Sequence, residues 1–148
     1  MDDPQEIASD GPSLIVAAVD GTDTSMRAAA YATGLARRGG ARLVFLFVRG
    51  LGGLSSATAM SASLVRAGED ETFRELTRIA AERVATLGVS VTVVDRAGDP
   101  YHVITQVVRE QKADLIVVGA SMGIGHKVAG ALGSRLIKAK ICPVLVVP

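Results

Sequence analysis

The sequence has 148 residues, the length of one ordinary domain, and its sixteen basic and fifteen acidic side chains give a formal net charge of +1. It contains no long block of like charge and no basic stretch interleaved with aromatic residues, which argues against nucleic acid or a membrane surface as the main partner. No apolar run approaches the roughly 18 residues that a membrane-spanning helix needs, and the N-terminus lacks a basic-then-apolar signal pattern, so we expect a cytoplasmic protein.

Apolar residues make up 49% of the sequence but aromatic residues only 3%, so the core must consist mainly of Val, Leu, Ile and Ala. Runs of these residues are typical of parallel strands that are buried on both faces. The only cysteine, Cys142, lies in one such run, so no internal disulfide can form. We interpret it as a buried thiol that serves as a small hydrophobic side chain rather than as a nucleophile.

The chain begins with residues 1–12, which hold four acidic residues, no basic residue and two prolines. This segment cannot bury enough apolar surface to order its backbone, so we predict a flexible acidic tail followed by a single domain over residues 13–148. A first strand is predicted where a short apolar run ends at Asp20. The next four residues carry several side-chain oxygens that can cap a helix.

A helix over about 24–38 follows, because alanine and leucine recur on one stripe and two glycines at 39–40 permit a left-handed C-cap. A second apolar strand comes directly after it. Residues 49–68 are rich in Gly, Ser and Ala, and a loop of this length is typically a lid, a binding loop or a mobile segment. Its place after a strand allows a lid, and disorder of residues 50–68 is the alternative.

Three helices and three strands are predicted after this loop. They are a helix over 69–87, a strand over 89–94, a helix that starts at Pro100, a strand over 115–119, a helix through about Lys140 and a strand over 142–148. Asp99 can cap the second of these helices, since proline is well suited to the first helical position.

Strands that alternate with helices through right-handed crossovers form a parallel sheet with helices on both faces. We therefore predict a doubly wound five-stranded sheet of order 3-2-1-4-5, in which the strand order reverses between the first and fourth strands. Ligands bind such sheets beyond the carboxyl ends of the strands at this reversal. Asp20 follows the first strand, where a carboxylate can accept hydrogen bonds from a base or a ribose. Glycines follow the fourth strand, where amides suit phosphate.

The glycines at 119, 123 and 125 spell G-x-x-x-G-x-G, as in the cofactor loop of short-chain dehydrogenases. That loop follows a first strand and precedes a long catalytic region, whereas here only residues 126–148 follow Gly125. The G-x-x-x-x-G-K-[ST] loop of P-loop ATPases is absent as well. Because the chain has no tryptophan and few tyrosines near its loops, a stacked flavin is disfavoured too. We expect neither NAD nor a flavin.

Three segments together resemble the universal stress protein family, over Leu14 to Pro148. They are "LIVAAVDGTDTSMRAAAYA", "GDPYHVITQVVREQKADLIVVG" and "CPVLVVP". The resemblance implies a Rossmann-like fold of the adenine nucleotide alpha hydrolase type.

Nucleotide-binding members of this family carry G-x2-G-x9-G-[ST], a loop that wraps the phosphates of ATP. Gly123, nine intervening residues and Gly133-Ser134 fit the second half of this pattern, whereas three residues rather than two separate Gly119 from Gly123. The resemblance implies that Asp20 contacts adenine or ribose, that Val48 forms a wall of the base pocket, and that the glycine loop binds phosphate. The candidate nucleotide-binding residues are Val19, Asp20, Val48, Gly119, Ala120, Gly123, Gly133 and Ser134.

Two functions from different classes follow. The first is a stress-response or regulatory protein that binds ATP or AMP, with or without Mg²⁺, and hydrolyses ATP slowly at most. The second is a homodimeric interaction module of the same fold that binds no nucleotide. No Ser-His-Asp or Cys-His constellation can be assigned, and neither His102 nor His126 has a cysteine or a second histidine at metal-binding spacing. We therefore expect no catalytic residue and no metal site made by the protein alone.

The final strand, Cys142 to Val147, is apolar and is expected at an edge of the sheet. An uncovered apolar edge strand invites aggregation unless another chain pairs with it. The family resemblance implies such pairing with a second copy, so we predict a homodimer.

Overall fold

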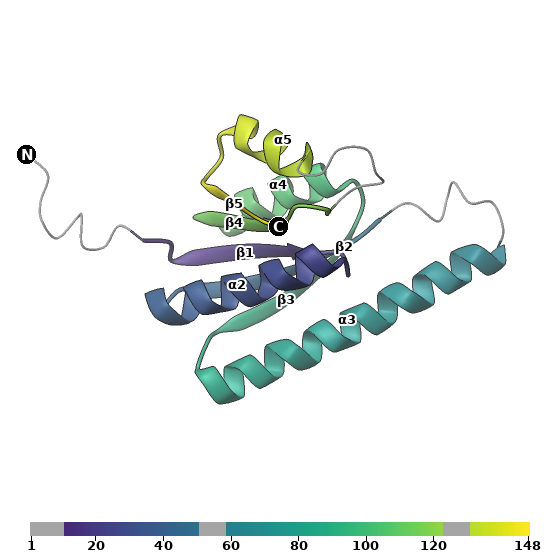
Figure 1. The fold of residues 1–148 in the computed structure, drawn as a ribbon, viewed down its shortest axis with the longest axis horizontal. Coiled ribbons are helices and arrows are strands. Elements are labelled where there is room, and N and C mark those ends of the chain that lie inside the picture. The colour runs from purple at the N-terminus through teal and green to yellow at the C-terminus, as the bar shows by residue number, and fades with distance from the viewer. Residues whose placement is uncertain (1–10, 51–58, 123–130) are drawn as a thin grey trace, which may run out of the picture.

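The computed structural model describes residues 11–50, 59–122 and 131–148. Strands and helices alternate along them, as predicted (Figure 1). The strands are β1 (Leu14–Val19), β2 (Arg42–Arg49), β3 (Val91–Ala97), β4 (Leu115–Gly119) and β5 (Val144–Val147), and the helices are α2 (Asp23–Gly39), α3 (Ala59–Leu87), α4 (Pro100–Gln111) and α5 (Ala131–Ala139). None of the described helices is long and apolar enough to cross a membrane.

The five strands form one parallel sheet of order β3-β2-β1-β4-β5, which confirms the predicted order. β1 is the central strand and is buried along its whole length. In its register Val19 lies beside Phe47 of β2, and Ile15 lies beside Leu115 of β4. The strand order therefore reverses between β1 and β4, and β5 is an edge strand.

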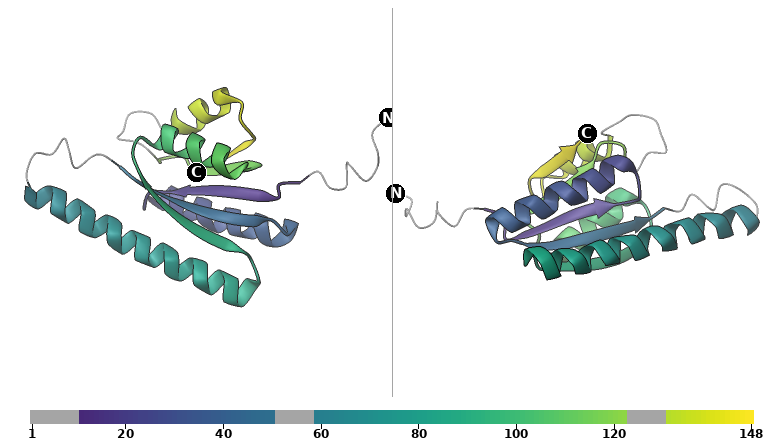
Figure 2. Two further views of the ribbon diagram at one scale, coloured as in Figure 1. Left: turned by 180° about the vertical axis from the view of Figure 1, so that it is seen from behind. Right: turned by 60° about the horizontal axis from the view of Figure 1, so that its bottom comes forward.

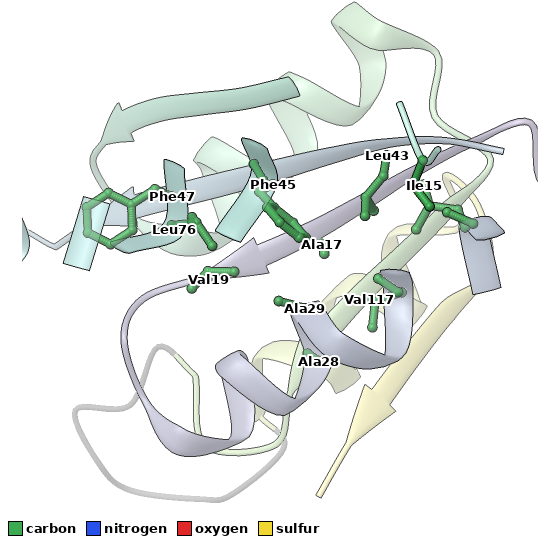
Figure 3. Packing of buried hydrophobic residues seen from close by; sticks show 14 of the residues in the cluster. Ile15, Ala17, Val19, Ala28, Ala29, Leu43, Phe45, Phe47, Leu76 and Val117 are labelled. Atoms are coloured by element: carbon green, nitrogen blue, oxygen red, sulfur yellow. The ribbon is translucent and has the colours of Figure 1, made fainter. Parts of the chain in front are cut away.

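Two apolar layers enclose the sheet, because alternate strand residues point to opposite faces. Helices α2 and α3 cover one face, where Ala28, Leu76 and Phe45 belong to the same buried cluster (Figures 2 and 3). Helices α4 and α5 cover the other face, where Ile104 and Leu136 are buried. As the composition predicted, aliphatic side chains make up most of both layers.

Local signals determine several of the helix ends. Asp99 caps α4, since its carboxylate accepts a hydrogen bond from the amide of His102 at 3.1 Å, and Pro100 is the first helical residue. Gly40 ends α2 in a left-handed conformation with φ of 68°. Both features were predicted from the sequence. At the start of α2 the capping residue is Thr22, whose hydroxyl accepts from the amide of Ser25.

The predicted loop over 49–68 is wrong for residues 59–68, which form the first part of α3. This half of the segment is rich in alanine and contains no proline, so its residues favour a helix, and Gly68 in the helix interior costs only about 1 kcal/mol. Residues 51–58 lie outside the described part of the chain, as do residues 1–10 of the tail predicted over 1–12. The first turns of α3 extend beyond the sheet (Figure 1), so Met60 and Leu64 are exposed.

Candidate functional site

The carboxyl ends of β1 and β4 lie side by side at the point where the strand order reverses. Asp20 follows the last residue of β1, and Gly119 is the last residue of β4. The topology therefore brings these two candidate residues to the same edge of the sheet, which is where ligands bind in folds of this class.

Asp20 is half-buried and orders the turn between β1 and α2. Its Oδ1 accepts hydrogen bonds from the amide of Thr22 at 3.1 Å and from the hydroxyl of Thr22 at 2.7 Å. The amide of Asp20 donates to the hydroxyl of Ser25 at 3.3 Å. The carboxylate thus supports the cap of α2 from a position at the strand end, and this structural role is compatible with contact to a ligand.

Gly119 packs directly against the first turn of α2. A Cβ atom at this position would collide with the hydroxyl of Thr24 and with the backbone between Thr24 and Ser25. The backbone of Gly119 is not left-handed, so the close approach of two backbones is what requires glycine here. The end of β4 and the start of α2 are therefore held in contact.

The three amides that follow β4 are all engaged within the protein. The amide of Ala120 donates to the carbonyl of Val147 at 2.8 Å, and that of Met122 donates to the carbonyl of Gly119 at 3.2 Å. The amide of Ser121 donates to Oγ1 of Thr24 at 3.0 Å. In this conformation none of the three is available to a phosphate, and the side chain of Met122 is buried in the core beneath α4 and α5.

The second half of the glycine pattern falls on α5. Gly133 and Ser134 are the third and fourth residues of that helix, and Gly123 lies outside the described residues. Gly133 is buried against Val146 of β5, so helix packing accounts for its small size. Ser134 lies in the first turns of α5 and is exposed.

A model of the universal stress protein family matches residues 13–148. The chain belongs to the universal stress protein family. It is 31% identical over 141 residues to universal stress protein MJ0531 of Methanocaldococcus jannaschii, covering 90% of this chain and 80% of that protein. The solved structure of UspA from Lactobacillus plantarum is similar to it with a TM-score of 0.75 and 27% identity, covering 92% of this chain and 97% of that one.

Two solved structures similar to this universal stress protein were determined with nucleotides. One is a universal stress protein in complex with cAMP, with a TM-score of 0.66 and 23% identity, covering 93% of this chain and 97% of that one. The other is a universal stress protein family protein of Arabidopsis thaliana with AMP bound, with a TM-score of 0.65 and 20% identity, covering 92% of this chain and 91% of that one. At these identities the likeness shows a shared fold.

In this universal stress protein the two candidate valines lie on opposite faces of the sheet. Val19 is buried in the layer beneath α2 and α3. Val48, the expected wall of a base pocket, is 3% exposed and belongs to the layer beneath α4 and α5. The structure therefore does not bring these two side chains together, although both lie near the carboxyl ends of their strands.

Arg49 is a feature that the sequence argument missed. It ends β2, and its guanidinium donates to Asp95 of β3 from Nε at 2.9 Å and from Nη2 at 3.1 Å, and to Asp70 of α3 from Nη1 at 2.7 Å. It also lies 5.2 Å from the centroid of the Phe47 ring. The hydrogen bonds that Arg49 donates to Asp95 raise the pKa of Arg49, while partial burial acts against it. The signal in the sequence is Asp95, an acidic residue next to the strand predicted over 89–94, where it needs a basic partner.

The hydroxyl pair formed by Thr24 and Ser121 was missed as well, because these residues are 97 positions apart. Other candidate groups are placed much as predicted. Cys142 is half-buried rather than fully buried, and burial raises the pKa of its thiol. The side chain of His102 is exposed, and His126 lies outside the described residues. Within the described ranges, no three His, Cys, Asp or Glu side chains are grouped to hold a metal ion.

Proposed function

We propose that this universal stress protein binds an adenine nucleotide at the carboxyl ends of β1 and β4 and serves as a stress-response or regulatory protein. The observation that carries the proposal is the position of Asp20, a half-buried aspartate at the strand-order reversal. Structures of the same fold that contain cAMP or AMP support an adenine nucleotide as the ligand class. We further propose that the protein acts in the cytoplasm.

The described residues fit the nucleoside part of such a ligand better than its phosphates. Asp20 supplies an acceptor for ribose hydroxyls or the adenine amino group. On the phosphate side, the amides of residues 120–122 are already engaged, and the exposed Ser134 hydroxyl is a remaining donor. We therefore expect AMP to bind at least as tightly as ATP, with any Mg²⁺ held chiefly by the phosphates. Hydrolysis of ATP, where it occurs, is proposed to be slow.

Titration calorimetry of the native protein with AMP, cAMP and ATP tests this proposal. The Asp20→Ala variant should bind about tenfold more weakly or not at all, because the nucleoside loses its acceptor. Asp99→Ala is the matched control, since Asp99 is also an aspartate at the start of a helix that follows a strand. It should bind like the native protein. If the native protein binds none of the three nucleotides, the proposal is wrong.

The engagement of residues 120–122 favours a second candidate, an interaction module of the same fold that binds no nucleotide. The three amides already have acceptors inside the protein, and Met122 anchors the segment in the core. A phosphate that used these amides would have to displace those bonds. Absence of nucleotide binding together with a stable dimer would support this candidate.

We propose in either case that two copies pair along β5, over Cys142 to Val147. β5 is an edge strand. The carbonyl of Pro143 accepts a hydrogen bond from the amide of Ile116 in β4, and that of Val147 accepts one from the amide of Ala120. The alternate residues Val144 and Val146 therefore direct their backbone groups toward the open edge. Light scattering should give about twice 15.3 kDa for the native protein and 15.3 kDa for Val144→Pro, which removes one outward N–H. A dimer that survives this change would place the interface elsewhere.

A further inference from the structure

Two hydroxyl groups meet across the strand-order reversal, one from each side. Thr24 lies in the first turn of α2, and Ser121 follows β4. Their oxygens are 2.6 Å apart, and the amide of Ser121 donates to Oγ1 of Thr24 at 3.0 Å. Both residues are half-buried, so part of each residue remains exposed.

The two hydroxyls carry two protons, and their mutual hydrogen bond uses one of them. If Thr24 donates within the pair, Ser121 keeps its proton, and the reverse arrangement leaves the proton on Thr24. Among the described residues neither hydroxyl has another hydrogen-bond partner. The pair therefore has one donor left for an acceptor outside it, and the bond within the pair polarises that donor.

The surroundings of the pair favour an anionic acceptor. Thr24 lies in the first turn of a seventeen-residue helix, whose positive end stabilises negative charge. Gly119 packs directly beneath the Thr24 hydroxyl, and the neighbouring amides of Ala120 and Met122 are engaged by carbonyls. Next to residues 120–122, whose amides are engaged, the hydroxyl pair thus offers a donor to a ligand. Asp20 at the end of β1 is suited instead to the nucleoside.

We infer that the Thr24–Ser121 pair binds a phosphoryl oxygen of the nucleotide through its remaining hydroxyl proton. This inference rests on the proposed nucleotide-binding function and adds two residues that the glycine pattern does not contain. Hydrogen bonds to a charged acceptor are stronger than those between neutral groups. The pair therefore distinguishes AMP, which has a phosphoryl group, from adenosine, which has none.

The test compares AMP, adenosine and inorganic phosphate by titration calorimetry on the full-length protein. The variants are Thr24→Val, Ser121→Ala and the double variant that combines them. The double variant should bind AMP about tenfold more weakly while its affinity for adenosine is unchanged. Weaker binding of inorganic phosphate by the double variant would show that the phosphoryl group alone is recognised.

The single variants identify the donor. Ser121→Ala is the cleaner of the two, because it leaves the Ser121 amide bonded to Thr24. If Ser121 is the donor, Ser121→Ala should weaken AMP binding, but by less than the double variant, because the Thr24 hydroxyl that it frees can donate in its place. Thr24→Val frees that amide, which can then replace part of the lost interaction, so its effect should be smaller. Thr24→Ser keeps a hydroxyl and should restore AMP binding.

Thr33→Val is the matched control, because Thr33 lies on the same helix and its hydroxyl donates to the carbonyl of Ala29, away from the Thr24–Ser121 pair. It should bind AMP like the native protein, and all variants should keep the native circular dichroism and unfolding midpoint. Native AMP affinity in the folded double variant would overturn the inference and leave the proposed function standing. Equal affinity of the native protein for AMP and adenosine, or tighter AMP binding by the double variant, would also overturn it. If the native protein binds no nucleotide, both proposals fall.

Discussion

Gly133 of α5 lies so close to Val146 of β5 that a Cβ atom at position 133 would come 2.6 Å from Cγ2 of Val146. Real Cβ atoms do not approach a methyl group this closely, so the contact requires glycine. This contact gives a structural reason for a residue that belongs to the nucleotide-binding pattern. It packs α5 against β5, the edge strand along which we propose that two copies pair.

Replacing Gly133 with alanine should destabilise the protein by about 1–2 kcal/mol, because the strain of the new contact exceeds the gain in helix propensity. Urea unfolding measures the change. Gly34→Ala on α2 is the matched control, since its Cβ would meet the Arg38 side chain at an ordinary 3.5 Å. That variant should be stabilised by about 0.5–1 kcal/mol. In a background that carries Val146→Ala, Gly133→Ala should cost less stability than in the native protein, because the methyl group that it meets is gone. An equal cost in both backgrounds would assign the strain to another contact.

Replacing Gly119 with alanine should cost more, about 3 kcal/mol or above, because the new Cβ meets backbone rather than a side-chain tip. The backbone between Thr24 and Ser25 cannot move without breaking the start of α2. Soluble yield and the urea midpoint are the measurements. Gly68→Ala serves as the control, since a Cβ there meets nothing within 4 Å. A native midpoint for Gly119→Ala would show that the two segments separate easily.

The sequence predicted those parts of the fold that depend on local signals or on the order of elements. The dipeptide Asp99-Pro100 identified the start of α4 because both residues act on the helix that they precede. The strand order followed from the alternation of strands and helices, given right-handed crossovers. The beginning of α3 does not follow from composition, because a mixture of Gly, Ser and Ala is typical of a loop even where, as over residues 59–68, it forms a helix.

The site could be predicted less well, because it depends on contacts between distant segments. Asp20 and Gly119 were placed correctly since each is next to a strand end. The bond between Thr24 and Ser121 requires the distance between α2 and β4, which no residue pattern encodes. The engagement of the Ala120 amide likewise depends on where β5 ends, because that amide donates to the carbonyl of Val147.

Asp114 should make the stability of the protein depend on pH. Its carboxylate accepts hydrogen bonds from the hydroxyl of Ser13 at 2.7 Å and from the amides of Ser13 and Leu14 at 2.9 Å. These bonds, led by that of the Ser13 hydroxyl, lower the pKa of Asp114 from its ordinary value of 3.8. The stabilisation is therefore complete above the ordinary pKa and is lost as the pH falls through the lowered one.

At pH 7, Asp114→Ala should be less stable than the native protein by about 1 kcal/mol, a value reduced for solvent exposure of the carboxylate. The difference should shrink as the pH is lowered below about 4. Urea unfolding at a series of pH values measures it. Ser13→Ala removes the largest cause of the pKa shift but keeps the carboxylate, so it should show a smaller difference of the same sign. A difference independent of pH would contradict this account.

Arg49→Lys should destabilise the protein by about 1 kcal/mol although the charge is kept. The guanidinium joins Asp95 of β3 to Asp70 of α3 and lies near the Phe47 ring, and an ammonium group cannot make this forked set of hydrogen bonds. The loss should appear in the urea midpoint and in faster hydrogen exchange of α3, because Arg49 is one of the residues that join that helix to the end of β2. Arg78→Lys is the control, since Arg78 pairs with glutamates of its own helix and is exposed. It should leave the midpoint unchanged, and an equal loss in both variants would show that Arg49 acts only as another surface charge.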